Sequence, residues 1–224
     1  MALASVNSSY SEARWQQAPT LLSDAETARM AALFEERLNL PYSLCWHLAS
    51  LGLNDETITD FLHPKLRTSL PDPYVMKDAE HAVNLIKDVV KNRQPIGLFG
   101  DYDVDGACSA ALFRLVLGAF GVPVWCHIPD RFKEGYGPNL KALKALKAQG
   151  AELILTVDCG ITAHAPLAAA AEEGMSVIVI DHHKAGVVLP RAEAVINPNR
   201  LDDDSGLGHL CAAAVCFLVL AGVV

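Results

Sequence analysis

The chain has 224 residues, of which 51% are hydrophobic and 20% are charged, a composition that supports a packed core and excludes a largely disordered protein. Its formal net charge is −8, so the molecule as a whole lacks the basic surface that is usual for tight nucleic-acid binding. Any contact with a nucleic acid must therefore be local.

Nothing in the sequence indicates export or insertion into a membrane. Residues 1–17 are polar, without the basic start and apolar run of a secretory signal. The apolar stretch 212–224 is too short to span a bilayer and predicts a buried helix. The six cysteines form no C-x-x-C pair, so we expect reduced core residues rather than a zinc site or a disulfide framework. These features predict a cytoplasmic protein without a membrane partner.

The front third of the chain has helical patterns. Residues 21–38 carry apolar side chains at helical spacing, with Ser23 or Asp24 able to cap and Glu26 placed for a capping box. A short helical pattern follows, and residues 54–73 predict a helix opened by Asn54 and broken at Pro64, followed by a loop with Pro71 and Pro73. We therefore expect residues 1–78 to form a small N-terminal helical segment.

After an amphipathic helical pattern at 78–92, short apolar runs alternate with helical stretches. Such alternation is typical of parallel βαβ units. The expected strands are 96–99, 122–128, 153–157, 177–180 and 194–196, and the expected helices between them are 107–120, 139–149 and 163–173. Each of these helices ends at a glycine that can adopt a left-handed cap. Residues 79–224 thus predict an α/β fold, a mainly parallel doubly wound sheet flanked by helices.

Three of the expected strands run directly into an aspartate, namely Asp101, Asp158 and Asp181. Residues just after parallel strands gather at one edge of the sheet, where open α/β proteins bind ligands. We therefore expect these acids to converge. Further candidates lie beside them in the chain: Asp103, Asp105, Cys159, His182 and His183.

Each of these residues has an ordinary explanation when taken alone. An aspartate at a strand end is commonly a helix cap or a turn residue, and histidines on a turn are commonly just solvated, as we expect for His81, His127 and His164. The spacing Asp-x-Asp-x-Asp-Gly also occurs in calcium loops, but the downstream glutamate of such a loop is missing and a strand precedes the run.

The combination of acids and imidazoles has a more specific implication. Several carboxylates at one sheet edge repel one another unless cations hold them together. Oxygen-rich ligation with one or two imidazoles favours manganese or magnesium over a structural zinc site. Two such ions form the usual apparatus for hydrolysing a phosphodiester.

Three motifs carry a resemblance to a known family. GDYDVDG (100–106), VDCG (157–160) and DHH (181–183), in this order and each after an expected strand, resemble the first three motifs of the DHH phosphoesterases. The stretches PDRFKEGYG (129–137) and SGLGHLCAAAV (205–215) are similar to the RecJ branch of that family. The helical front, including FLHP (61–64), is similar as well, so the resemblance covers nearly the whole chain after the first dozen residues.

The resemblance implies roles for particular residues. The metal ligands for two Mn2+ or Mg2+ ions would be Asp101, Asp103, Asp105, Asp158 and His182, with Asp158 bridging the ions. His183 would meet the scissile phosphate, acting in catalysis with Asp105 and Asp158, and Asp181 would support the ligands from behind. Arg131 would grip a substrate phosphate, for which a surface ion pair is the alternative. His209 would touch substrate, with a capping or packing role as the alternative.

The resemblance also implies a function. It is metal-dependent phosphodiester hydrolysis, as a 5′ to 3′ exonuclease on single-stranded DNA in DNA repair and recombination, with a single-stranded-DNA-binding protein and a helicase as further partners. One alternative is a DHH phosphatase or oligoribonuclease acting on short nucleotides. Another is a scaffold with a DHH fold that has lost catalysis, against which the full set of motif acids argues.

The sequence departs from the family in two places. RecJ relatives often have glycines near positions 212 and 214, where this chain has Ala212 and Ala214, which puts a tight contact by this turn in doubt. The chain stops at Val224 inside an apolar stretch, before a further acidic motif, a second catalytic domain and an oligonucleotide-binding barrel of the family. We therefore expect a truncated domain that binds at least one divalent ion but is nearly inactive alone.

Overall fold

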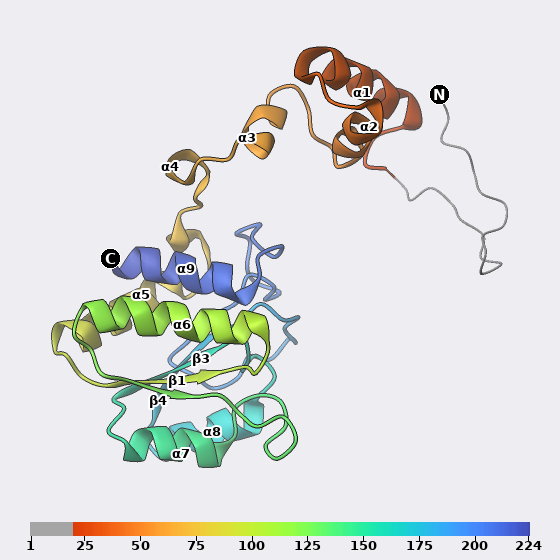
Figure 1. Cartoon of the computed structure of the whole chain (residues 1–224). Coiled ribbons are helices and arrows are strands. Elements are labelled where there is room, and N and C mark those ends of the chain that lie inside the picture. The colour runs from red at the N-terminus through yellow and green to blue at the C-terminus, as the bar shows by residue number, and fades with distance from the viewer. Residues whose placement is uncertain (1–19) are drawn as a thin grey trace. The chain divides into compact units, whose positions relative to one another are not determined.

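The computed structural model describes residues 20–224, and these residues divide between Leu70 and Pro71 into two compact units. We describe each unit by itself (Figure 1). Residues 1–17, which lack the pattern of a secretory signal, lie outside the described residues. Asp78 belongs to the second unit, where its carboxylate accepts hydrogen bonds from Val195 N and Arg200 Nη1. The expected domain limits, 1–78 and 79–224, remain a prediction.

The first unit consists of short helices around a small core. Its elements are α1 (Asp24–Leu38), α2 (Tyr42–Ser50), α3 (Ile58–Leu62) and α4 (Leu66–Ser69). The predicted capping box at the start of α1 is confirmed, because Ser23 Oγ accepts from Glu26 N and the Glu26 carboxylate accepts from Ser23 N. Phe34 and Ile58 are fully buried in the core of this unit.

Asn54 opens a helical turn as predicted, because its Oδ1 accepts from Glu56 N and Thr57 N and its carbonyl accepts from Ile58 N at 3.0 Å. The regular helix α3 begins only at Ile58 and ends before Pro64, so it is shorter than expected. The loop expected after Pro64 is wrong in part, because it contains α4. The chain leaves α3 at His63, whose φ of −129° suits a residue before proline. The segment is therefore α3, α4 and a 3-10 turn, Pro73–Val75.

The second unit contains a five-stranded sheet in which every pair of neighbours is parallel. The strands are β1 (Ile96–Gly100), β2 (Val124–His127), β3 (Leu153–Val157), β4 (Ser176–Ile180) and β5 (Ala194–Ile196), in the order β2-β1-β3-β4-β5. The strand order reverses between β1 and β3, so the crevice at their carboxyl ends is a topological switch point. The predicted parallel α/β sheet is confirmed.

Helices cover both faces of this sheet, as expected for a doubly wound fold (Figure 1). On one face lie α5 (Ala79–Lys91), α6 (Val104–Ala119) and α9 (Ala212–Val223), and on the other lie α7 (Leu140–Ala148) and α8 (His164–Glu172). The glycine caps are confirmed. At the end of α6, Gly121 has φ +73° and Val122 N donates to Leu117 O, so Val122 closes the helix and β2 begins only after Pro123.

Two further expectations concern the cysteines and the membrane. Cys45, Cys159 and Cys216 are buried and free, as predicted, but Cys108, Cys126 and Cys211 are exposed, so the expectation of six core cysteines is wrong for half of them. Those three lie on α6, on the edge strand β2 and just before α9, where they are exposed although their neighbours in the sequence are apolar.

In the described part of the chain, no helix is both long enough and apolar enough to cross a membrane.

Candidate metal centre

The aspartates that follow β1 and β3 come together at the carboxyl edge of the sheet, as the sequence predicts. One ligand atom each from Asp101, Asp103 and Asp158 lies within 4.8 Å of the others, and the same holds for Asp158, His182 and His183. Asp158 belongs to both groups and lies at the switch point between β1 and β3. We call Asp101, Asp103 and Asp158 the acid cluster.

The start of α6 fixes the first two acids. Asp103 is the N-cap of α6, and its Oδ1 accepts from Gly106 N at 3.0 Å. A Cβ on Gly106 would lie 2.6 Å from Asp101 O and 2.7 Å from Asp101 Cβ. Only glycine therefore allows the first turn of α6 to stand directly against Asp101. This contact explains why a glycine follows the acids of the run at 100–106.

Two buried carboxylate oxygens of the acid cluster have no hydrogen-bond partner among the described residues, Asp101 Oδ1 and Asp158 Oδ1. The two residues are 4% and 1% exposed, so water does not readily solvate these oxygens. A buried polar atom that lacks a partner is costly, and native proteins normally keep such atoms for a ligand, an ion or water. The donor set therefore fits a cation.

The electrostatics of the cluster support this interpretation. Burial, followed by the charges of Asp105 and Asp103, raises the pKa of Asp158 to about 8. Burial also raises the pKa of Asp101, whereas the hydrogen bond from Gly106 N lowers that of Asp103. The repulsion that raises the pKa of Asp158 is what a divalent cation would cancel.

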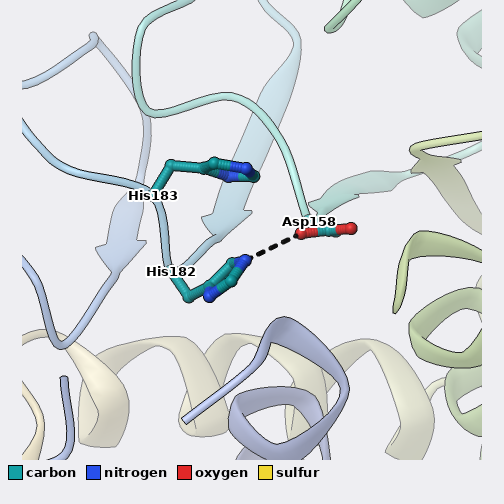
Figure 2. A group of neighbouring side chains, drawn as sticks. All are labelled: Asp158, His182 and His183. Atoms are coloured by element: carbon teal, nitrogen blue, oxygen red, sulfur yellow. Dashed lines mark ion pairs between the residues drawn. The ribbon is translucent and has the colours of Figure 1, made fainter. Parts of the chain in front are cut away.

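His182 connects Asp158 to Asp105. Its Nε2 lies 3.4 Å from Asp158 Oδ1 and 3.7 Å from Asp105 Oδ2, and Figure 2 shows the ring pointing at Asp158. Asp105 also makes two hydrogen bonds, because its two oxygens accept from Ala212 N at 2.7 Å and Ala213 N at 2.8 Å. The first turn of α9 does make a tight contact, and it does so through backbone amides that alanine supplies as well as glycine.

Asp181 is the buried support of the two histidines. Its Oδ1 accepts from His182 N at 2.7 Å and His183 N at 3.1 Å, and His183 Nδ1 lies 2.7 Å from the same oxygen. Its Oδ2 accepts from Ile161 N at 3.0 Å. Asp181 thus orients the ring of His183, whereas it holds His182 only through the backbone.

Asn197 and Asn199 were not identified from the sequence, and they hold the backbone of the two histidines. Asn197 Nδ2 donates to His183 O at 2.8 Å. Asn199 Nδ2 donates to His182 O and, at 3.2 Å, to Gly208 O. The signal was available, because both residues follow the expected strand 194–196 in the same way that the aspartates follow theirs.

A second missed residue is Tyr136, in the loop between β2 and α7. Its hydroxyl lies 3.3 Å from Asp158 O and 3.3 Å from His183 Nδ1. Burial and the neighbouring acids raise its pKa, so it remains a neutral phenol. In the same loop, Arg131 places its guanidinium over the ring of Tyr102 at 5.3 Å, and among the described residues it makes no ion pair.

His209 lies outside the groups of converging ligand atoms. It is exposed, and within residues 20–224 its side chain makes no hydrogen bond or ion pair with the acids. It does not cap α9 either, because the N-cap is Cys211 and the first amides of that helix donate to Asp105. Its predicted contact with substrate stays a prediction.

The sheet topology and the acids at the switch point define a ligand-binding α/β domain. The chain belongs to the DHH family, because the family model described as "DHH family, N-terminal domain" matches residues 95–221.

Among curated proteins, the single-stranded-DNA-specific exonuclease RecJ of Bacillus subtilis is 41% identical over 157 residues, which is 70% of this chain and 20% of that protein. This chain therefore spans about a fifth of the length of that relative.

Two solved structures are similar to this chain. A crystal structure of exonuclease RecJ bound to manganese has a TM-score of 0.60 and 36% identity, covering 66% of this chain and 37% of that one. RecJ from Thermus thermophilus in complex with Mn2+ has a TM-score of 0.67 and 28% identity, covering 91% of this chain and 28% of that one.

Proposed function

We propose that this chain is the metal-binding part of an exonuclease of the RecJ branch, which hydrolyses phosphodiester bonds from the 5′ end of single-stranded DNA. The observation that carries the proposal is the pair of buried, unpartnered oxygens, Asp101 Oδ1 and Asp158 Oδ1, beside two imidazoles. The two similar RecJ structures are bound to manganese, which supports Mn2+ here, with Mg2+ as the other candidate.

The proposed ligands of two ions are those expected from the sequence, Asp101, Asp103, Asp105, Asp158 and His182. Asp158 is the proposed bridge, since it belongs to both groups of converging ligand atoms. Two divalent ions bound there would activate a water molecule and stabilise the leaving oxygen of a phosphodiester. The acids would hold both ions at one point of the sheet edge. Because Asp101 and Asp158 are buried, the attraction between their carboxylates and the ions would be stronger than in water.

His183 and Arg131 are the proposed phosphate contacts. Because Asp181 Oδ1 is an acceptor 2.7 Å from His183 Nδ1, the His183 ring carries a hydrogen at Nδ1. A hydrogen bond from Nε2 to a phosphate oxygen needs a hydrogen there as well, so the proposed phosphate contact is made by the imidazolium form of His183. Arg131 is held over Tyr102 by a cation–π contact and keeps its guanidinium free to grip a phosphate with two hydrogen bonds.

The other candidate functions differ in substrate or in catalysis. A phosphatase or oligoribonuclease would favour dinucleotides over long strands, and a scaffold would hydrolyse neither. The complete set of acids and their unpartnered oxygens argues against the scaffold. A cytoplasmic location and binding of a single-stranded-DNA-binding protein and a helicase belong to the same proposal.

The test begins with Mn2+ binding by isothermal titration calorimetry. We expect the chain to bind Mn2+ and Asp158→Ala to weaken binding by about 100-fold, because a bridging carboxylate serves both ions. Asp88→Ala, which removes an exposed acid from α5, is the matched control and should bind like the wild type. Equal affinity of the wild type and Asp158→Ala would remove Asp158 from the site.

Hydrolysis is then measured with Mn2+ on 5′-phosphorylated single strands, duplexes and dinucleotides. Because the chain spans about a fifth of the Bacillus subtilis relative, the assay uses both this chain and a chimera in which it replaces the matching part of that relative. We expect the chimera to release nucleotides from the 5′ end of single strands. Preference for dinucleotides would favour the short-nucleotide enzyme, and cleavage from the 3′ end would contradict the proposed polarity.

A further inference from the structure

We propose that Tyr136 is a positioning residue that fixes both Asp158 and His183 through one hydroxyl group. The proposal rests on the proposed function, because it concerns how the chain prepares its metal ligands before an ion binds. Tyr136 itself is not a ligand in this proposal. It acts through the backbone of Asp158 and through the ring of His183.

Asp158 needs such support because of its backbone conformation. It follows β3 with φ +60°, a left-handed conformation that costs an L-residue other than glycine about 1 kcal/mol. Its N–H donates to Ile180 O at 3.0 Å, and its carbonyl accepts from the Tyr136 hydroxyl at 3.3 Å. With both ends of the residue held, the carboxylate is directed at Asp101 and Asp103.

The same hydroxyl touches the ring of His183. The hydroxyl lies 3.3 Å from Nδ1, and the two rings meet edge to face with centroids 5.9 Å apart. Nδ1–H donates to Asp181 Oδ1 at the shorter distance of 2.7 Å and shares its hydrogen with the Tyr136 oxygen, so the hydroxyl accepts from His183 and its own hydrogen is left for Asp158 O. Tyr136 therefore links the loop after β3 to the loop after β4.

The loop that carries Tyr136 is itself anchored, so the position of the hydroxyl is defined. Glu134 Oε1 accepts from Asp130 N at 2.9 Å, and Glu134 Oε2 lies 2.9 Å from His127 Nε2. The ring of His127 stacks on Phe99 of β1 at 5.3 Å. The anchoring runs from the sheet through His127 and Glu134 to Tyr136.

Core packing does not explain Tyr136. The residue is 50% exposed, so removing its hydroxyl should cost little stability. Its neighbour Tyr102 packs edge-on against it, with centroids 6.5 Å apart, and the hydroxyl of Tyr102 makes no hydrogen bond with any described residue. Tyr102→Phe is therefore a matched control that removes a hydroxyl from the same aromatic pair.

The experiment compares Tyr136→Phe, Tyr102→Phe and the wild type by Mn2+ titration calorimetry and by the electron paramagnetic resonance spectrum of bound Mn2+. We expect Tyr136→Phe to weaken Mn2+ binding by up to about tenfold, the effect of losing one hydrogen bond, and to broaden the spectrum. Its melting temperature should stay within a few degrees of the wild type, and Tyr102→Phe should match the wild type in every measurement.

Three results separate the possibilities. Unchanged affinity and spectrum in Tyr136→Phe would overturn the positioning role. A lower melting temperature with unchanged affinity would also overturn it, because the hydroxyl would then serve stability alone. Failure of the wild type to bind Mn2+ would instead contradict the proposed function on which the inference rests.

Discussion

The second unit contains two groups of carboxylates, one of which is paired with an arginine and one of which is not. At the base of α5, Asp78 and Asp202 share Arg200, whose guanidinium lies 2.7 Å from Asp78 Oδ2 and 2.8 Å from Asp202 Oδ2 and also donates to Val195 O. We call this group the arginine-paired cluster. In the acid cluster, by contrast, no lysine or arginine from residues 20–224 pairs with an acid.

The difference appears in the ionisation of the two groups. Hydrogen bonding to Arg200 lowers the pKa of Asp202, whereas burial and like charge raise the pKa of Asp158 to about 8. The same fold thus supplies a guanidinium to one pair of acids and only the imidazole of His182 to the other. We infer that the acid cluster is kept for a cation from solution, and that unsatisfied charge, rather than the number of acids, marks the functional site.

Breaking the arginine-paired cluster should give the largest loss of stability. Arg200→Met keeps an apolar stem but leaves Asp78 and Asp202 without their cation and Val195 O without a donor. Only 6% of the Arg200 side chain is exposed, but the Asp78 and Asp202 side chains are 41% and 60% exposed, so we expect a loss of about 2 kcal/mol in the free energy of unfolding, measured in urea at pH 7.

Two controls accompany Arg200→Met. Arg191→Met, at an exposed arginine, should change stability by less than about 0.5 kcal/mol. Because the pKa of Asp202 is lowered in the folded state, its stabilisation is present above its unfolded pKa and is lost as the pH falls through the folded value. The gap between wild type and Arg200→Met should therefore narrow in acid, and a gap that widens there would contradict the pairing.

A smaller loss of stability is expected for Asn199, which holds the backbone of His182 beside the acid cluster. Asn199→Ala removes the bonds to His182 O and Gly208 O, so we expect a loss of about 1–2 kcal/mol and Mn2+ binding weakened by about tenfold. Asn92→Ala, on the far end of α5, should leave Mn2+ affinity unchanged. If both variants bind Mn2+ like the wild type, Asn199 serves only the fold.

The smallest effect on stability is expected at Arg131, which contacts the ring of Tyr102 but no carboxylate of the described chain. Arg131→Ala should change the free energy of unfolding by less than about 1 kcal/mol. In the chimera it should reduce the preference for 5′-phosphorylated over 5′-hydroxyl single strands by about tenfold. Lys133→Ala, whose side chain pairs with Asp130, is the control, and an unchanged preference in Arg131→Ala would exclude the phosphate grip.

The sequence predicted much of the sheet because its signals are local. Every expected strand is present, and the rule that parallel strands end at one edge brings Asp101 and Asp158 together. The capping glycines were predictable for the same reason, because each closes its own helix. The segment after Asn54 was mispredicted only in extent, because α3 begins at Ile58 and the short helix α4 follows Pro64 where a loop was expected.

The contacts between distant segments could not be read from the sequence. Asp105 was predicted as a ligand, but that its oxygens would also receive the amides that open α9 depends on the packing of α6 against α9. Tyr136 lies in a loop whose path over Asp158 follows no periodicity. Spacing along the chain finds the acids, and only the tertiary structure shows which of them are left unsatisfied.

The most direct test of that unsatisfied charge compares the wild type with Asp158→Asn, a neutral replacement of similar shape, without metal and with Mn2+. The raised pKa means that the contribution of Asp158 to stability is fully present below its unfolded value of about 3.8 and is lost as the pH rises through about 8. Without metal, Asp158→Asn should therefore become more stable than the wild type as the pH rises, by on the order of 2 kcal/mol near pH 9.

Mn2+ should reverse this order. We expect it to raise the melting temperature of the wild type and to leave that of Asp158→Asn nearly unchanged, since the amide cannot offer the bridging charge. If Asp158→Asn is instead the less stable protein without metal at pH 9, and Mn2+ stabilises both proteins equally, the acid cluster is not a cation site held in readiness.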